Sequence, residues 1–266
     1  MNGGKVTAEA LRTMKARSEK IAALAVYDFF TAKLVDEVGV PLILVGDSLG
    51  MALLGYENTL TVTMDEMLHH VRAVARAKLR ALIVADMPYR TYTTAEDALR
   101  NARRFVEAGA EAVKLEGGEP VLDQVRALVG AEIPVVGHIG LLPQSVKETG
   151  GYKVQGRKPE SAEHLIRDAR LLEEAGAFAI VIECVVAPAA KRISEALKIP
   201  TIGIGAGAGC DGQILVGHDM LGLFTRFTPK HVKRYANLAD EMRKAFATYK
   251  GEVESGEFPG KEQSFS

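Results

Sequence analysis

Short apolar runs rich in Val, Ile and Leu recur along the chain, and amphipathic segments with helical spacing of apolar residues separate them. The runs are continuous rather than alternating, which is typical of strands covered on both faces in a parallel sheet. The pattern predicts strands near residues 21–27, 42–46, 81–85, 112–115, 134–137, 179–182 and 201–204, with a weaker one near 215–222.

Eight strand–helix units without a break in composition predict an α/β fold, a single (β/α)8 TIM barrel covering residues 1–266. We expect the helix near Ala8–Arg17 to cap the bottom of the barrel and Pro229–Lys250 to form a terminal helix. Residues 255–266 are a tail that is either loose or packed on a neighbouring subunit. A doubly wound open sheet is the structural alternative, but the glycine-rich turn expected after its first strand is missing from AVYDFFTAK.

Composition and charge narrow the class of protein. The formal net charge is -1 and no basic block stands out, which argues against nucleic acid or an anionic membrane as partner. The N-terminal segment is polar, and no apolar run approaches the roughly 20 residues that span a bilayer. Cys184 and Cys210 cannot form a disulfide framework, and we interpret both as structural. These features predict a cytoplasmic protein.

Polar residues stand where five consecutive predicted strands end, in ILVGD, LIVAD, VKLE, VVGH and IVIE. In a TIM barrel these ends share one rim, where active sites are built. One such aspartate could simply cap the next helix, but several carboxylates together repel one another unless a cation lies among them. The residues concerned are Asp47, Asp86, Glu116, His138 and Glu183.

Carboxylate oxygens select a hard cation, Mg²⁺ first and Mn²⁺ next, and no cluster with zinc spacing exists in the sequence. The candidate metal-site residues are Asp47, Asp86 and Glu116. Each either binds the metal directly or interacts with a group that binds it. Lys114 stands two residues before Glu116, so both side chains lie on the same face of their strand. Lys114 could form a Schiff base with a ketone, bind an anionic substrate as an ammonium, or pair with a rim carboxylate.

Glu183 follows the most apolar of these strands, and burial there would raise its pKa toward that of a general base. His138 is either a second acid/base group, a hydrogen-bond donor or a structural histidine.

Two loops remain open to alternative interpretations. The glycines of TIGIGAGAGCDG either bind a phosphate or another anion, or permit close packing. The long connection IGLLPQSVKETGGYKVQGRKPE is either a lid hinged at Gly150 and Gly151 or a tolerated insertion.

The segments VGDSLGM, ADMPY, VKLEGG, VVGHIGLLPQSV, GGYKVQGR, VIECV and IGIGAG followed by CDGQILV together resemble the 3-methyl-2-oxobutanoate hydroxymethyltransferase (ketopantoate hydroxymethyltransferase) family. The resemblance runs from about residue 5 to the tail. It implies a Mg²⁺-dependent barrel enzyme of pantothenate biosynthesis, usually a homodecamer. Such an enzyme transfers a one-carbon unit from 5,10-methylenetetrahydrofolate to 3-methyl-2-oxobutanoate, giving 2-dehydropantoate.

The same resemblance implies roles for individual residues. Glu183 would be the proton acceptor. The metal-site residues would be Asp47, Asp86 and Glu116. The residues in contact with the oxo acid would be Asp47, Ser48, Asp86 and Lys114. The chemistry of the site, and not the resemblance, adds that His138 could steady the same site or relay protons.

Three other functions compete with this one. A Mg²⁺-dependent lyase or mutase of the phosphoenolpyruvate/isocitrate-lyase type would need a reactive cysteine in a mobile loop, and KETGGYKVQGR contains none. A Schiff-base aldolase would use Lys114 as a nucleophile. A catalytically inactive scaffold would have neutral residues at the rim, where this sequence keeps its carboxylates.

Overall fold

The structure is a computed structural model that describes residues 4–145, 151 and 153–265. The chain divides into two compact units, Met1–Val216 and Gly217–Ser266.

The first unit is a closed barrel of parallel strands that follow one another in chain order, and the last strand pairs with the first. This confirms the (β/α)8 fold predicted from the apolar runs. The side chains of the barrel strands are largely buried on both faces, as continuous apolar runs require. The strands are β1 (Ile21–Ala25), β2 (Leu42–Val45), β3 (Leu82–Asp86), β4 (Ala112–Glu116), β5 (Val135–Gly140), β6 (Ala179–Glu183), β7 (Thr201–Ile204) and β8 (Gly212–Val216).

Strand register brings polar residues of neighbouring strand ends side by side. Asp86 on β3 pairs with Lys114 on β4, and Glu116 on β4 pairs with His138 on β5. One strand further, Gly140 on β5 pairs with Glu183 on β6. Neighbouring parallel strands lie about 4.8 Å apart, so this register alone places charged side chains of adjacent strands within contact distance.

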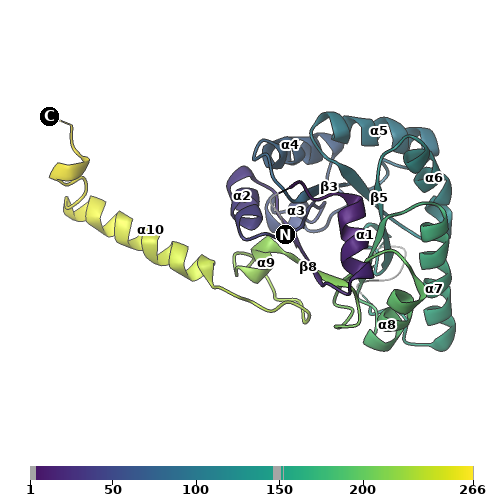
Figure 1. The fold of residues 1–266 in the computed structure, drawn as a ribbon. Helices are drawn as coiled ribbons and strands as arrows, with labels where there is room; N and C mark the ends of the chain where they lie inside the picture. Colours follow the sequence, from purple (N-terminus) through teal and green to yellow (C-terminus); the bar gives the residue numbers. More distant parts are fainter. Residues whose placement is uncertain (1–3, 146–150, 152, 266) are drawn as a thin grey trace. The chain divides into compact units, whose positions relative to one another are not determined.

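Amphipathic helices surround the strands of this unit (Figure 1). The α5 helix is typical: it begins after Thr94, whose side chain accepts a hydrogen bond from the Asp97 N–H, and it buries Ala98, Ala102 and Phe105. The helices are α2 (Phe29–Glu37), α3 (Leu49–Ala52), α4 (Met64–Ala75), α5 (Ala95–Glu107), α6 (Leu122–Gly130), α7 (Pro159–Glu174) and α8 (Ala187–Ala196), with 3-10 turns η1 (Glu119–Val121) and η2 (Pro143–Ser145).

The N-terminal helix α1 (Ala8–Ala16) lies at the amino ends of the strands, as predicted. It buries Leu11 and Met14. Lys15 Nζ reaches Asp211 Oδ2 at 2.8 Å, directly before β8. Lys5, just ahead of the helix, donates to the Ala81 carbonyl at 2.6 Å, directly before β3. The segment therefore closes the barrel at the end opposite the polar rim.

The second unit contains α9 (Gly217–Met220), α10 (Leu238–Ser255) and the 3-10 turn η3 (Lys261–Gln263). None of the residues of α10 is buried. Every helix among the described residues is too short or too polar to cross a membrane. The expectation of one domain over residues 1–266 stays a prediction.

Two predicted boundaries are wrong. The eighth strand is Gly212–Val216, not 215–222, because the chain turns at Gly217 into the short polar helix α9, which contains His218 and Asp219. The terminal helix begins at Leu238 instead of Pro229 and continues to Ser255. It ends there because Gly256 takes the left-handed conformation, with φ 78°, that stops a helix.

Candidate active site

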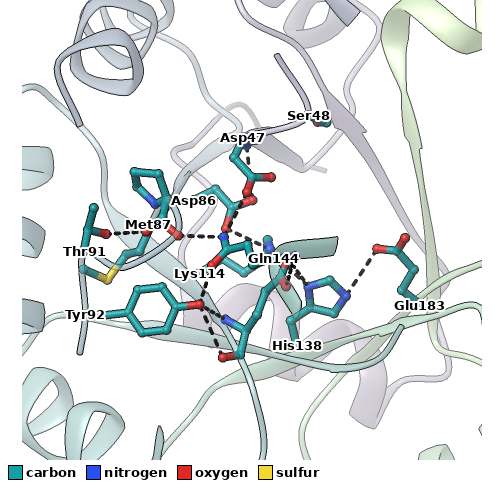
Figure 2. A network of polar contacts seen from close by, with 12 residues as sticks. Asp47, Ser48, Asp86, Met87, Thr91, Tyr92, Lys114, His138, Gln144 and Glu183 are labelled. Carbon is teal, nitrogen blue, oxygen red and sulfur yellow. Dashed lines mark hydrogen bonds and ion pairs between the residues drawn. The ribbon is translucent and has the colours of Figure 1, made fainter. Parts of the chain in front are cut away.

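A group of charged side chains lies at the carboxyl ends of the strands, where the sequence predicted a polar rim (Figure 2). Asp47 lies two residues after the end of β2, Asp86 and Glu183 end β3 and β6, and His138 lies within β5. The side chains of Glu183 and Ser48 are partly exposed, whereas the others are almost completely buried. The buried members are Asp47, Asp86, Lys114, Glu116 and His138, each at most 5 % exposed.

Lys114 extends inward from β4 and pairs with Asp86. Its Nζ lies 2.8 Å from Asp86 Oδ1 and 3.2 Å from His138 Nδ1. Burial alone would lower the pKa of Lys114, but the negative charges of Asp86, Glu116 and Asp47 outweigh burial and raise it. Lys114 is therefore an ammonium at neutral pH, and the neutral amine that Schiff-base formation requires is disfavoured.

His138 lies between two carboxylates. Its Nδ1 is 3.5 Å from Glu116 Oε1, and its Nε2 is 3.3 Å from Glu183 Oε2. Burial and the charge of Lys114 lower the pKa of His138, but Glu116 and Glu183 raise it to about 9. His138 thus carries a proton on both ring nitrogens at neutral pH in the protein without ligands. The Nε2 atom is buried and makes no well-aligned hydrogen bond with any described residue.

The environment of Glu183 differs from the one that the sequence suggested. Its side chain keeps 18 % of its surface exposed, so it is less buried than an apolar strand end indicates. Figure 2 shows Glu183 on the side of the His138 ring away from Lys114. The carboxylate is therefore the most accessible charged group of the rim among those described.

Asp47 is not the cap of the helix that follows it. The N-cap position of α3 belongs to Ser48, and no side-chain hydrogen bond caps this helix. Burial raises the pKa of Asp47 well above its ordinary value, and the negative charges of Asp86 and Glu116 raise it further. A buried carboxylate in repulsion with two others is a position where a positive charge is stabilised.

The pKa values of the other two buried carboxyl groups, Asp86 and Glu116, shift in opposite directions. Burial raises the pKa of Asp86, even though Lys114 opposes it. Burial also acts to raise the pKa of Glu116, but His138, Lys114 and the backbone N–H of Gln144 outweigh it, so this pKa lies below its ordinary value. Glu116 is therefore ionised and engaged within the protein.

Two residues of this network were not found from the sequence, Gln144 and Tyr92. Gln144 is 3 % exposed and lies in η2, on the loop after β5. Its Nε2 donates to Asp47 Oδ2 at 2.9 Å, and its backbone N–H donates to Glu116 Oε2 at 3.0 Å. The Tyr92 hydroxyl donates to Gln144 Oε1 at 2.6 Å. Neutral side chains in loops produce no periodic signal, and only the PQS of VVGHIGLLPQSV marked the position.

Ser48 belongs to the same rim but has a different environment. Its Oγ shares a hydrogen bond of 2.8 Å with the hydroxyl of Tyr27, which is fully buried. Ser48 itself is partly exposed. Tyr27 therefore holds the Ser48 hydroxyl in place from the buried side, and the hydroxyl stays accessible to a ligand.

The residues present fit a divalent metal ion in part. In the described ranges, no three His, Cys, Asp or Glu side chains lie close enough together to hold a metal ion. Glu116 is turned toward His138 and Gln144. Asp47 and Asp86 remain, two buried carboxylates that repel each other. Mg²⁺ typically takes one or two carboxylates and completes its coordination with water and substrate oxygens, so this pair suits it.

The other candidates from the sequence stand apart from this network. Burial raises the pKa of the Cys184 thiol to about 11 and also raises that of Cys210, as expected for unreactive structural cysteines. In the glycine stretch, a Cβ on Gly212 would lie 2.4 Å from the Ile21 carbonyl oxygen, which supports the packing interpretation. Of the proposed hinge, Gly150 lies outside the described residues.

The comparisons with known proteins identify the family of this chain. The family model described as ketopantoate hydroxymethyltransferase matches residues 5–261. The 3-methyl-2-oxobutanoate hydroxymethyltransferase of Syntrophus aciditrophicus is 56 % identical over 99 % of this chain and 97 % of its own length. That of Enterococcus faecalis is 56 % identical over 98 % of this chain and 96 % of its own length.

Solved structures show the same fold at low identity. A phosphonopyruvate hydrolase in complex with oxalate and Mg²⁺ superposes with a TM-score of 0.64 at 17 % identity, over 92 % of this chain and 87 % of that one. A 2,3-dimethylmalate lyase of the PEP mutase/isocitrate lyase superfamily gives a TM-score of 0.59 at 16 % identity, over 97 % and 91 %. The match of sequence and fold along nearly the whole chain places it in the ketopantoate hydroxymethyltransferase family.

Proposed function

We propose that this chain transfers a hydroxymethyl group from 5,10-methylenetetrahydrofolate to 3-methyl-2-oxobutanoate and so forms 2-dehydropantoate, a step of pantothenate biosynthesis. The observation that carries the proposal is the family match over residues 5–261. The reactive side chains predicted from the sequence also lie together at the carboxyl end of the barrel, where such a reaction needs them.

Glu183 is the proposed general base. It removes the proton from C3 of the oxo acid, and the electron pair of that C–H bond forms the enolate. The enolate carbon then bonds to the methylene carbon of the folate, and water supplies the hydroxyl oxygen. Both C–N bonds of that methylene carbon break, and tetrahydrofolate leaves with its N5 and N10 protonated by the proton taken from C3 and one proton of the water. Two observations support this role: Glu183 is the accessible carboxylate, and His138 Nε2 lies 3.3 Å from its Oε2 and orients it.

Lys114 and Ser48 are the proposed anchors of the substrate. The Lys114 ammonium lies against Asp86 and neutralises negative charge that develops on the substrate oxygen. The Ser48 hydroxyl, held by Tyr27, donates to a carboxylate oxygen of the oxo acid. A charged lysine in this position favours electrostatic binding over a covalent adduct.

Asp47 and Asp86 are the residues that would hold Mg²⁺, with Glu116 supporting them through Gln144 and His138. A bound divalent cation would supply Lewis-acid stabilisation of the substrate oxyanion. The phosphonopyruvate hydrolase of the same fold was crystallised with oxalate and Mg²⁺, which supports a metal and a small carboxylate ligand in this type of barrel.

Proton exchange tests the role of Glu183. We expect the protein with Mg²⁺ to exchange the C3 proton of 3-methyl-2-oxobutanoate for deuterium in D₂O, followed by NMR, without any folate. Glu183→Gln removes the base and should slow exchange by about 100-fold or more. Glu195→Gln on the exposed face of α8 is the matched control, and it should exchange at the wild-type rate.

The outcomes separate the two parts of the proposal. Exchange that survives in Glu183→Gln would rule out the assigned base. Exchange in the wild type without formation of 2-dehydropantoate from 5,10-methylenetetrahydrofolate would rule out the folate as donor. Chelation of divalent cations should abolish exchange, whereas trapping of a borohydride-reduced adduct on Lys114 would support the aldolase instead.

We also propose that the protein is a cytoplasmic homo-oligomer, a decamer as the family resemblance implies. The α2 helix supports an oligomer, because Phe30, Leu34 and Val38 lie one turn apart and are 75 %, 63 % and 79 % exposed. Apolar side chains grouped on one helix face are typical of surfaces covered in an assembly. Light scattering on the purified protein measures the number of chains directly.

A further inference from the structure

Gln144 occupies the centre of the hydrogen-bond network at the barrel rim. Its Nε2 donates to Asp47 Oδ2 at 2.9 Å and to the Met87 carbonyl at 3.0 Å. Its Oε1 accepts from the Tyr92 hydroxyl at 2.6 Å, and its backbone N–H donates to Glu116 Oε2 at 3.0 Å. Both ends of the side-chain amide and the backbone N–H are therefore engaged by four different groups (Figure 2).

The direction of each hydrogen bond follows from the chemistry of the partners. A carbonyl oxygen such as that of Met87 only accepts, so the NH₂ group of Gln144 must face it. The carbonyl oxygen of Gln144 then faces Tyr92, whose single proton goes to this contact of 2.6 Å and not to the Glu116 carbonyl oxygen at 3.4 Å. The Tyr92 oxygen is left to accept from the Glu116 N–H at 3.3 Å. Only one orientation of the amide satisfies all of these contacts.

This single orientation determines which oxygens of the two carboxylates remain available. Asp47 Oδ2 is occupied by Gln144, and among the described residues Asp47 Oδ1 accepts no hydrogen bond. Glu116 Oε2 is likewise occupied by the Gln144 backbone, which leaves Oε1 toward His138 Nδ1 at 3.5 Å. One residue thus fixes the rotation of two carboxylates that belong to different strand ends.

We propose that Gln144 is a positioning residue that holds Asp47 with Oδ1 turned toward a bound cation and Glu116 turned toward His138, and that Tyr92 keeps its amide in the required orientation. The inference rests on the proposed function only for the use of the cation in the reaction. Hydrogen bonds that orient metal ligands typically change metal affinity by about 10–100-fold when they are removed.

Binding of Mn²⁺, measured from the electron paramagnetic resonance signal of the free ion, tests this role without any turnover. We expect Gln144→Leu, which keeps the approximate volume and removes the amide, to weaken Mn²⁺ binding by at least about 10-fold. Tyr92→Phe removes only the hydroxyl, and we expect a loss of about 10-fold, the lower end of the range for such orienting partners.

A control variant separates positioning from general stability. Ser194→Ala removes a buried hydroxyl that bonds to the Ala190 carbonyl at 2.9 Å and to Thr201 Oγ1 at 2.7 Å, at the amino end of β7. It should lower the melting temperature and leave Mn²⁺ affinity within about two-fold, because it orients no rim carboxylate.

Every outcome of the Mn²⁺ binding measurements either supports or overturns the proposed role of Gln144. Wild-type Mn²⁺ affinity in both Gln144→Leu and Tyr92→Phe would overturn the proposal, as would a wild-type protein that binds no Mn²⁺. An equal loss in Ser194→Ala would also overturn it, because general destabilisation would then explain the effect. If Gln144→Leu does not fold, the Mn²⁺ affinity of Tyr92→Phe alone tests the proposal. Weakened binding in the variants combined with no C3 proton exchange in the wild type would support the positioning role while it refutes the proposed function.

Discussion

Lys114 is the cation on which the buried rim depends, so its removal tests the electrostatic account of the site. Lys114→Met keeps the length of the side chain and deletes its charge. The ammonium lies 2.8 Å from Asp86 Oδ1, and the two side chains are 4 % and 3 % exposed. The substitution would leave the buried Asp86 carboxyl without its counter-charge and raise its pKa further, and Asp47 and Glu116 would lose the same neutralising charge.

The size of the effect follows from two opposing terms. At an effective dielectric constant of about 20, unit charges 2.8 Å apart attract by about 6 kcal/mol. Burial of the two ions costs several kcal/mol each, so the net contribution of the pair is small. Removing one partner leaves the other charge buried without compensation, which costs about 3–5 kcal/mol. We therefore expect Lys114→Met to lower the free energy of unfolding by about that amount.

Urea unfolding followed by circular dichroism measures this loss, and a double variant tests its cause. In Lys114→Met/Asp86→Asn the buried charge is gone, so we expect most of the lost stability to return, to within about 2 kcal/mol of the wild type. A double variant no more stable than Lys114→Met alone would refute the coupling of the two residues. A neutral effect of Lys114→Met would refute the view that the rim carboxylates depend on this ammonium.

Two further predictions concern His138 and Gly140. Because the folded protein raises the pKa of His138 from about 6.5 to about 9, its contribution of about 3 kcal/mol is complete below pH 6.5 and is lost as pH rises through 9. The metal-free protein should lose stability to urea over this range, and an equally steep loss in His138→Gln would contradict the assignment. In Gly140→Ala a Cβ would lie 2.2 Å from the Glu183 carbonyl oxygen at φ 99°, so C3 proton exchange should fall by about 10-fold or more. Gly39→Ala is the control, because Gly39 has a φ of 84° and a Cβ there would meet no heavy atom within 4 Å. This variant should therefore show only the backbone strain of about 1–2 kcal/mol. An equal loss of proton exchange in Gly140→Ala and Gly39→Ala would refute the steric argument.

The charged members of the site were predictable because topology places them. All parallel strands of a barrel end on the same rim, so residues that follow apolar runs meet there whatever their separation in sequence. Asp47 and Glu183 are more than 130 residues apart, yet both belong to that rim. Alternation along β4 likewise placed Lys114 and Glu116 on one face, and both are buried.

The neutral residues and some boundaries were not predictable for equally physical reasons. Gln144 and Tyr92 lie in loops, where no period reports which way a side chain points. The eighth strand was placed too late because its apolar residues Ile214–Val216 are followed, after Gly217, His218 and Asp219, by a second apolar run that belongs to no strand. Glu183 was expected to be buried because its strand is apolar, but its exposure depends on the loops above that strand.

The buried group around Lys114 holds three carboxyl groups against one ammonium and one imidazolium, and this composition has a thermodynamic consequence. Burial and mutual repulsion raise the pKa of Asp47, so ionising all three carboxyl groups together is costly. A cation offsets this cost, whereas an anionic ligand alone adds to it. Linkage is reciprocal, so the factor by which a divalent cation strengthens binding of the oxo acid equals the factor by which the oxo acid strengthens binding of the cation. Cation and anion should therefore bind to this barrel cooperatively, each as an effector of the other.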